Sequence, residues 1–384
     1  MKIRENVLIS ELTTMCLGGE ARYVIEVDNK WQLKTVIDWA EDGGELSDGK
    51  KIIQSEGPLP WFVLGGGANT IGRDEGFPGV IILMRENWID IIDATEENVM
   101  VAAGAGTVWD DFVRFTVDHN FSGVECLAKI PGTVGAAPVQ NIGAYGQEVS
   151  QTIDHVEAYD TVAREFVILG RDEMKMSYRE TLFNTGPEAG RYIITSVAFV
   201  LYDADFEGMR PPFYSSLQKY LDENLGELAR AELDASGAAA VESIRESYDR
   251  NGYPPEVLYN GVSAIRGDKL PDPSVSASSG SFFRNIYFEP SDKEALALAE
   301  KSGCKIYDKP DGRKMINTGA LIEKAGFSGK LLHGMRVSEK ASLVLINESA
   351  KSYADLAAAR AEIREGVRNK FGFEIRQEPV EIVA

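Results

Sequence analysis

Histidine, cysteine and positive charge are scarce in this sequence, and each scarcity excludes a class of protein. The chain of 384 residues has three histidines and three cysteines, all far apart from one another. Isolated histidines argue against a zinc site or a histidine-based catalytic triad. Three widely spaced cysteines provide no disulfide framework, which is typical of proteins from a reducing compartment. We therefore expect a cytoplasmic protein with no bound metal.

The deficit of positive charge argues against binding to a nucleic-acid backbone. Lys and Arg total 40 against 60 Asp and Glu, which gives a formal net charge of −20. No basic stripe offsets this excess, so an anionic nucleotide could bind only in a locally positive pocket. Apolar runs are too short for a membrane span, and the N-terminus has no apolar core of a signal peptide. We expect neither a membrane nor a nucleic acid as partner.

Hydrophobic residues make up 44% of the chain and charged residues 26%, the balance of a globular protein. The length predicts two or three compact units. Strands alternate with a few helices over roughly the first two hundred residues, which favours an α+β fold. The expected strands there are residues 22–27, 61–64, 79–84, 99–104, 153–159, 166–169 and 192–201.

Two helices are expected among these strands. Asn29 is expected to cap a helix that buries Leu33, Val36 and Ile37, and Thr107 is expected to cap a second amphipathic helix after residue 108. Further on, residues 225–250 are rich in Ala and Glu and read as helical. The expected elements that follow are helices at 293–301, 319–324 and 353–370, and strands at 305–307, 342–346 and 373–383.

Residues 130–146, IPGTVGAAPVQNIGAYG, form the most unusual stretch and are called the second glycine loop below. Its small side chains cannot build a core, but they let backbone N–H groups approach a ligand closely. Taken by itself, a glycine-rich stretch is more often a plain surface loop. Its length and its companion upstream favour a cofactor site instead.

That companion is the first glycine loop, residues 65–70 (GGGANT), which directly follows an expected strand. A strand that runs into glycines presents backbone N–H groups, a common arrangement for phosphate binding. The loop lacks the Gly-Lys-Ser/Thr of a Walker motif and the G-x-G-x-x-G spacing of dinucleotide-binding folds. Alone it fits a tight turn as well as a ligand loop.

Several motifs, in order, resemble the UDP-N-acetylenolpyruvoylglucosamine reductase family. They are LGGGANT (64–70), IPGTVGAAPVQNIGAYG (130–146), YRETLF (178–183), KLPDP (269–273), GSFFRN (280–285), LVLIN (343–347) and FGFEIRQEPV (371–380). The resemblance extends from about Thr13 to Val380. KLPDP and the aromatic segment at Tyr214 resemble the longer of the family's two subtypes, in which a loop carrying a tyrosine folds over the substrate.

The resemblance implies an α+β fold with a two-subdomain FAD-binding module of the PCMH/vanillyl-alcohol-oxidase-like type and a C-terminal α+β substrate domain. The expected divisions are residues 1–203 for the FAD module (subdomains about 1–70 and 71–203), 204–262 for the tyrosine loop and helical insertion, and 263–384 for the substrate domain, whose last strand returns to the active site. The implied reaction uses NADPH and noncovalent FAD to reduce UDP-N-acetylglucosamine enolpyruvate to UDP-N-acetylmuramate, in peptidoglycan synthesis. We expect a monomer.

Three residues match the family's catalytic positions. Arg179 is expected to stabilise negative charge on the substrate carboxylate, which fits a guanidinium well because it binds carboxylates bidentately. Ser281 matches the proton donor, and Glu378 matches the third active-site residue. Considered alone, each would be read as an ordinary surface or turn residue. The apolar residues around Glu378 predict that it is buried.

The other matched positions bind the cofactor or the substrate. Expected FAD contacts are Gly65, Gly66, Gly67, Ala68, Asn69, Ile130, Pro131, Gly132, Thr133, Gly135, Ala136, Asn141, Gly143, Ala144 and Arg266. Expected substrate contacts are Tyr145, Tyr178, Tyr214, Lys269, Asn285 and Tyr307, although a lone tyrosine is more often a core residue than a ligand.

The sequence departs from the family pattern in four places. The closing Leu-Glu-Pro-Glu is Ile375-Arg376-Gln377-Glu378 here, which keeps the glutamate but changes the approach to it. Ala68 replaces a serine, which removes one hydroxyl contact to the cofactor. Residues 284–286 read Arg-Asn-Ile where Lys-Asn-Pro is usual, and residues 226–252 form a longer insertion than usual.

Two other functions compete with the reductase. An oxidase of the same fold, acting on an alcohol or a sugar, commonly tethers FAD to a histidine, and neither glycine loop contains one. A noncatalytic nucleotide-sugar-binding protein would keep the glycines and lose the arginine, serine or glutamate, all of which are present. Both arguments favour the reductase.

Overall fold

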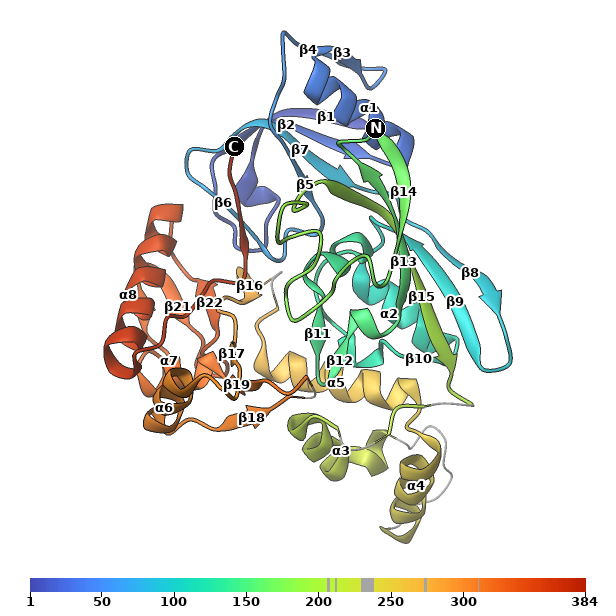
Figure 1. Ribbon diagram of the computed structural model, residues 1–384, viewed down its shortest axis with the longest axis vertical. Coiled ribbons are helices and arrows are strands. Elements are labelled where there is room, and N and C mark those ends of the chain that lie inside the picture. Colours follow the sequence, from blue (N-terminus) through green and yellow to red (C-terminus); the bar gives the residue numbers. More distant parts are fainter. Residues whose placement is uncertain (206–207, 211–212, 229–237, 273–274, 310) are drawn as a thin grey trace. The chain divides into compact units, whose positions relative to one another are not determined.

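The computed structural model describes residues 1–205, 208–210, 213–228, 238–272, 275–309 and 311–384 (Figure 1). The chain divides into two compact units. Unit 1 comprises Met1–Arg4, Val24–Gly66 and Val80–Asp268, and unit 2 comprises Glu5–Tyr23, Gly67–Gly79 and Lys269–Ala384. Both mix helices with strands, as the predicted α+β class requires. No helix of the described residues is long and apolar enough to cross a membrane.

The first sheet has the strand order β1-β2-β7-β5, with β5 and β7 parallel. Its strands are β1 (Lys2–Leu8), β2 (Glu20–Val27), β5 (Trp61–Leu64) and β7 (Phe77–Met84). Helix α1 (Lys30–Asp42) follows β2, and the Asn29 side chain accepts a hydrogen bond from the Gln32 N–H. The predicted cap and the predicted buried face are confirmed. The hairpin β3–β4, Gly44–Ser47 and Ile52–Ser55, was not predicted.

A six-stranded antiparallel sheet forms the centre of unit 1, in the order β14-β13-β15-β9-β8 with β10 also paired to β15. Helix α2 (Trp109–Asp118) packs on β15, where the ring centroids of Phe112 and Phe199 lie 4.5 Å apart. The strands are β8 (Ile89–Ala94), β9 (Asn98–Gly104), β10 (Phe121–Ser122), β13 (Ile153–Asp160), β14 (Glu165–Gly170) and β15 (Tyr192–Asp203). The predicted strands of this region are confirmed; β8 was missed.

The start of α2 corrects the expected role of Thr107. The N-cap residue is Val108, whose side chain cannot accept a hydrogen bond. The Thr107 hydroxyl instead donates to the Trp88 carbonyl at 3.1 Å, so it holds a neighbouring strand rather than the helix end. The prediction was wrong because it paired Thr107 with the adjacent helix end, whereas in the fold its hydroxyl bonds to the carbonyl of a residue distant in sequence.

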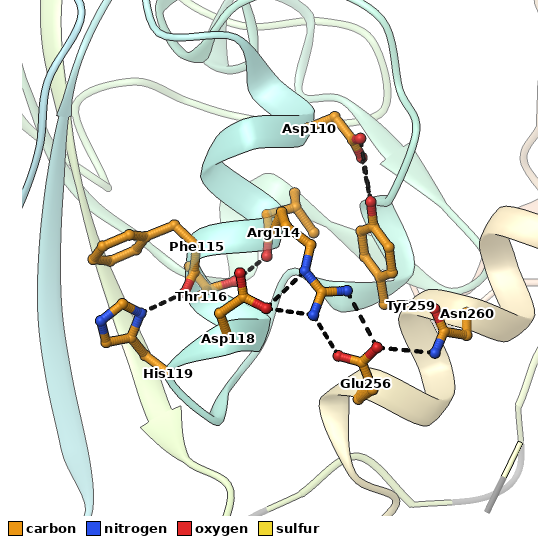
Figure 2. Close-up of polar contacts among 10 residues, drawn as sticks. Asp110, Arg114, Phe115, Thr116, Asp118, His119, Glu256, Tyr259 and Asn260 are labelled. Carbon is orange, nitrogen blue, oxygen red and sulfur yellow. Dashed lines mark hydrogen bonds and ion pairs between the residues drawn. The ribbon is translucent and has the colours of Figure 1, made fainter. Parts of the chain in front are cut away.

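Three helices follow the central sheet: α3 (Ser215–Leu228), α4 (Ala238–Asn251) and α5 (Pro255–Lys269). The helical prediction for residues 225–250 is confirmed at both ends, while residues 229–237 lie outside the described chain. One ion pair joins α5 to α2, between the Arg114 guanidinium and Glu256, and the same guanidinium also contacts Asp118 within α2 (Figure 2). At the other end of α2, Asp110 accepts a hydrogen bond from the Tyr259 hydroxyl of α5 at 3.2 Å (Figure 2).

Unit 2 has its own apolar core, built between its sheets and helices. One sheet has the order β16-β22-β21-β20 and another β17-β19-β18. The strands are β16 (Ser278–Ser281), β17 (Ile286–Phe288), β18 (Ile306–Asp308), β19 (Lys314–Ile316), β20 (Leu331–Leu332), β21 (Met335–Val337) and β22 (Val344–Asn347); the helices are α6 (Lys293–Ser302), α7 (Thr318–Lys324) and α8 (Tyr353–Phe371).

Helix α8 confirms its prediction in detail. Ser352 and Asp355 form a reciprocal capping box at its N-terminus, and Gly372 ends it in the left-handed conformation with φ 82°. The chain end differs from its prediction, because only β23 (Val380–Ile382) is a strand, paired in parallel with β6 (Thr70–Gly72). Before it, Gln377 makes a single bridge to Phe283. Pro379 lacks an N–H group, so the ladder cannot continue through it.

Glu381 fastens this last strand within unit 2. It accepts hydrogen bonds from Arg360 at 2.6 Å, Arg73 at 2.6 Å and the Tyr353 hydroxyl at 2.8 Å. Burial by itself would raise the pKa of Glu381, but these hydrogen bonds outweigh it and lower the pKa from 4.5 to about 2. A carboxylate with a lowered pKa stabilises the fold above its unfolded-state pKa and loses that contribution as pH falls toward the folded-state value.

We therefore expect Glu381→Gln to lower the free energy of unfolding at pH 7 by about 1–3 kcal/mol, because charge-assisted hydrogen bonds contribute on this scale. The difference from the wild type should be constant above pH 4.5 and shrink between pH 4.5 and 3, as measured by urea unfolding. Glu348→Gln is the matched control, since Glu348 forms a more exposed pair with Arg336. A deficit that stays the same from pH 7 to 3 would contradict this origin.

Candidate functional site

The second glycine loop lies along the segment that joins β9 to α2. Gly132 accepts a hydrogen bond from the Trp109 N–H at 3.1 Å, and the Val134 N–H donates to Thr107 at 2.8 Å. A Cβ atom on Gly135 would lie 2.5 Å from the Cβ of Ala105. The loop therefore depends on small residues on both sides, as its composition predicted.

Within unit 1, the two glycine loops meet. A Cβ on Gly66 would lie 2.9 Å from the Cα of Gly132, and one on Gly65 would lie 2.8 Å from the Thr133 hydroxyl oxygen. Real side chains do not tolerate such distances. The structure thus brings together residues that are distant in sequence, and only glycine fits at positions 65 and 66.

The rest of the first glycine loop belongs to unit 2. Gly67 has φ +66°, and a Cβ there would lie 2.0 Å from the Leu12 carbonyl oxygen. The Gly67 carbonyl accepts from the Thr14 N–H at 3.1 Å, and the Asn69 carbonyl accepts from the Val380 N–H at 2.9 Å. The first glycine loop therefore continues through Gly67 and Ala68 to Asn69, which is hydrogen-bonded to the C-terminal strand β23.

Arg266, on α5, carries an unsatisfied donor. Its Nε atom is buried and has no hydrogen-bond partner among the residues that the structure describes. Burial lowers the pKa of the guanidinium, while the nearby Tyr145 and Asp110 act in the opposite direction. A buried donor without an acceptor is uncommon in folded proteins, and an acceptor atom of a ligand would satisfy it.

Tyr145, in the second glycine loop, adopts φ +49°, and its ring lies 6.0 Å from that of Tyr214, edge to face. Burial raises the pKa of Tyr145, and Arg266 acts in the opposite direction. Tyr214 precedes α3 and is 44% exposed. Two of the predicted substrate tyrosines therefore lie together, beside the predicted flavin-contacting arginine.

Arg179 lies in a tight turn of unit 1. Ser177 and Glu180 pair across the turn, and Arg179 has φ +59°. Its guanidinium reaches the second glycine loop, where Nη1 donates to the Asn141 carbonyl at 2.9 Å and Nη2 lies 3.4 Å from the Gly143 carbonyl. It also lies 5.1 Å from the Tyr178 ring centroid. The predicted catalytic arginine thus contacts two predicted cofactor residues.

Asn141 is the polar centre of this loop and is 1% exposed. Its Nδ2 donates to the Glu148 carboxylate at 2.9 Å and to the Ser177 carbonyl at 3.1 Å, and its Oδ1 accepts from the Ser150 N–H at 3.1 Å. The side chain is therefore fully used within the protein. Its backbone is bonded too, because the N–H donates to the Pro138 carbonyl at 3.2 Å and the carbonyl accepts from Arg179. We had expected a cofactor contact at Asn141 without anticipating this structural role.

Asn184 is a polar residue near Arg179 that the sequence analysis did not single out. Its Nδ2 donates to the Arg179 carbonyl at 3.0 Å, and its Oδ1 accepts from the Thr181 N–H at 2.9 Å. The available signal was an asparagine shortly after a turn, a residue type that often bonds to nearby backbone. That signal is too common to identify a functional position.

Ser281 and Glu378 lie on adjacent segments of unit 2. Ser281 ends β16 and is exposed, and the next residue, Phe282, accepts a hydrogen bond from the Glu378 N–H at 2.8 Å. Arg284 N–H continues the pairing with the Arg376 carbonyl at 2.9 Å. Glu378 is 7% exposed, so its predicted burial is confirmed. The changed Ile375-Arg376-Gln377 approach does not prevent this pairing.

The remaining predicted substrate residues have separate surroundings in unit 2. Lys269 is exposed at the end of α5. The Asn285 Oδ1 accepts from the N–H of Thr318, the first residue of α7, at 3.1 Å, while Asn317 is the N-cap of that helix. Tyr307 lies on β18 with the Lys305 ammonium 4.8 Å from its ring centroid. No contact among the described residues joins these three side chains.

The residues present in unit 1 fit a flavin cofactor. Gly66 and Gly132 have no side chains to cover the backbone where they meet. A pyrophosphate or a flat ring can therefore come close to the backbone there. The buried Arg266 Nε supplies an unused donor for an anionic or carbonyl acceptor. No histidine lies in either glycine loop, so neither loop has the side chain that most often tethers flavin covalently.

Comparisons with known proteins agree with this geometry. The family model described as "FAD binding domain" matches residues 23–165. The model described as "UDP-N-acetylenolpyruvoylglucosamine reductase, C-terminal domain" matches residues 272–382. The two matches cover the glycine loops and the segment that holds Ser281 and Glu378.

Curated relatives align over nearly the whole chain. The UDP-N-acetylenolpyruvoylglucosamine reductase of Polynucleobacter asymbioticus is 34% identical over 367 residues, 95% of each chain. That of Ralstonia nicotianae is 37% identical, over 84% of this chain and 87% of its own. The crystal structure of the reductase from Thermus caldophilus aligns over all of both chains with a TM-score of 0.59 at 20% identity, which shows a shared fold. The chain belongs to the UDP-N-acetylenolpyruvoylglucosamine reductase family.

Proposed function

We infer that this protein is the FAD-dependent oxidoreductase that uses NADPH to reduce UDP-N-acetylglucosamine enolpyruvate to UDP-N-acetylmuramate, in peptidoglycan precursor synthesis. The observation that carries this inference is the alignment with a curated reductase over 95% of both chains. The oxidase alternative is not favoured. We further propose that the protein acts in the cytoplasm as a monomer and supports cell-wall growth, cell shape and division.

We propose three functional parts for the chain: residues 1–203 bind FAD, residues 204–262 carry the tyrosine loop and the helical insertion, and residues 263–384 bind substrate. The extents of the two family models support the first and last parts. The contact of Tyr145 with Tyr214 supports a link between the insertion and the second glycine loop.

We propose that the residues of the two glycine loops and Arg266 hold FAD. FAD held there would supply hydride transfer from NADPH to the vinyl carbon of the substrate. The small residues let the backbone approach the cofactor, and the unsatisfied Arg266 Nε donates a hydrogen bond to it. The cofactor residues proposed are Gly65, Gly66, Gly67, Ala68, Asn69, Ile130, Pro131, Gly132, Thr133, Gly135, Ala136, Asn141, Gly143, Ala144 and Arg266.

Arg179 is proposed to bind the substrate carboxylate. Hydride addition to the enol ether increases negative charge on that carboxylate, and a fixed cation stabilises the charge where it develops. The guanidinium's bonds to Asn141 and Gly143 support this role, because they fix its position before the substrate arrives. A preorganised donor need not reorient during the reaction.

Ser281 is proposed to donate the proton to the carbon that bears the carboxylate. A serine is a weak acid, so it requires a polarised setting and a group that restores its proton. Its exposure at the end of β16 leaves the hydroxyl accessible to substrate. Glu378, on the adjacent segment, is proposed as the third catalytic residue.

The substrate's phosphates, sugar and carboxylate are proposed to contact the polar groups around these residues. Lys269 supplies positive charge in an otherwise acidic chain, and the tyrosines combine a ring surface with a hydroxyl. The Asn285 amide has its Nδ2 donor for this purpose, because its bond to the Thr318 N–H uses Oδ1. The proposed substrate residues are Tyr145, Tyr178, Tyr214, Lys269, Asn285 and Tyr307.

The overall assignment predicts a yellow protein with noncovalent FAD. Acid precipitation should release the flavin into the supernatant. Under anaerobic conditions NADPH should bleach the flavin, and the enolpyruvyl sugar nucleotide should restore its colour. Flavin that remains in the pellet would contradict noncovalent binding, and failure of the sugar nucleotide to restore colour would contradict the reductase assignment.

The contact between the glycine loops predicts that Gly66→Ala loses FAD. The added methyl group would lie 2.9 Å from the backbone of Gly132, so the loops must separate. We expect FAD affinity to fall at least about tenfold, equivalent to about 1.4 kcal/mol, in a fluorescence titration of the apoprotein. Gly57→Ala is the control, because no atom lies within 4 Å of a Cβ at Gly57. Equal affinities in the two variants would refute the argument.

Ser281→Ala should separate the two half-reactions. Bleaching by NADPH needs no proton from Ser281, so its rate should stay near that of the wild type. Reoxidation by the sugar nucleotide should slow by about 10²–10⁴-fold, the usual loss for a positioned acid, and Ser281→Cys should recover part of it. Stopped-flow absorbance of the flavin measures both steps. If both halves slowed equally, Ser281 would be shaping the protein rather than donating a proton.

A further inference from the structure

The turn that carries Arg179 is held in an unfavourable backbone conformation. Tyr178 and Arg179 are its two central residues, because Ser177 and Glu180 pair on either side. The Ser177 N–H donates to the Glu180 carbonyl at 2.8 Å. Arg179 has φ +59°, a region that glycine and asparagine occupy far more readily than arginine. Such strain persists only where neighbouring groups hold it, and it is common at functional positions.

One of these neighbouring groups is the Asn184 amide, which bonds to the turn from outside. Its Nδ2 donates to the Arg179 carbonyl at 3.0 Å. Its other end, Oδ1, accepts from the Thr181 N–H at 2.9 Å. The same side chain therefore orients the Arg179 carbonyl and the backbone two residues later. The two bonds together require a neutral amide, because Nδ2 donates one of them and Oδ1 accepts the other.

The turn is also anchored to the second glycine loop. The Thr181 hydroxyl donates to the Val139 carbonyl at 2.7 Å. The Ser177 carbonyl accepts from the Asn141 Nδ2 at 3.1 Å. These bonds fix the two ends of the turn, and the Asn184 amide fixes its middle. The Arg179 guanidinium then reaches Asn141 and Gly143 from a defined backbone.

We propose that Asn184 is a positioning residue for Arg179: by binding the Arg179 carbonyl, it keeps the turn in the left-handed conformation from which the guanidinium meets the substrate carboxylate. Asn184 itself touches no substrate. The proposal rests on the proposed function of Arg179 for its catalytic consequence. Its conformational part concerns the protein alone.

Asn184→Asp is the most specific variant. It preserves the shape and the acceptor toward Thr181, but it replaces the donor with a carboxylate oxygen facing the Arg179 carbonyl. We expect the maximum rate of reoxidation by the sugar nucleotide to fall by about tenfold, the scale for losing one hydrogen bond and leaving a carbonyl unpaired. The rate of bleaching by NADPH should not change.

Asn224→Asp is the matched control. The Asn224 Nδ2 also donates to a backbone carbonyl, that of Tyr220, at 2.8 Å, but this bond lies within α3. The control makes the same chemical change and adds the same charge. Its reoxidation rate should equal that of the wild type.

A double-mutant cycle distinguishes positioning from a general structural effect. If Asn184 acts through Arg179, then Asn184→Asp should cause no further loss in the Arg179→Ala background, since interacting residues are not additive. Hydrogen exchange in the apoprotein provides a second readout that needs no substrate. The Ser177 and Glu180 amides should exchange faster in Asn184→Asp and at the wild-type rate in Asn224→Asp.

Each result has one meaning. Non-additive loss together with faster exchange at the turn supports the proposal. Additive loss, or faster exchange with an unchanged reoxidation rate, overturns it, because Asn184 would then only stabilise the fold. Unchanged exchange also overturns it. If the sugar nucleotide fails to reoxidise even the wild-type flavin, the proposed function is wrong, and the exchange experiment still decides whether Asn184 holds the turn.

Discussion

The close contact between backbone and backbone at Gly66 and Gly132 is the constraint on which the rest of unit 1 depends. A single methyl group at Gly66 would lie 2.9 Å from the other chain segment, so the two loops meet only because residue 66 has no side chain. The segment between β9 and α2 holds the second glycine loop from one side, and the Arg179 guanidinium holds it from another. The proposed cofactor residues and the proposed catalytic arginine are thus parts of one hydrogen-bonded assembly.

The helices after the central sheet extend this assembly. Asp110 accepts from the Lys129 backbone and ammonium groups, at 2.7 Å each, immediately before the second glycine loop. The same carboxylate accepts from Tyr259 of α5, the helix that also carries Arg266 (Figure 2). One carboxylate therefore bonds both to α5 and to the residue before the second glycine loop.

In unit 2 the proposed functional residues depend on a different element, the last residues of the chain. Glu378 pairs with Phe282, next to Ser281, and three residues later Glu381 takes hydrogen bonds from two arginines and a tyrosine. The cluster around Glu381 fixes the segment that also carries Glu378, the proposed catalytic residue. A short strand suffices because charged side chains, rather than a long ladder, hold it.

The sequence by itself determined the strands and helices with strong periodicity and the two glycine loops, and the family motifs in it mark the proposed catalytic positions. Local sequence patterns were enough for these elements, because the periodicity that predicts α1, α8 or β15 lies within the element itself. Only the tertiary structure decided what Thr107 bonds to, that the final strand is confined to Val380–Ile382, and that Asn184 holds the Arg179 carbonyl. Each of these depends on a partner that no local pattern specifies: a distant carbonyl, a proline that interrupts a ladder, and a turn whose strain requires an external donor.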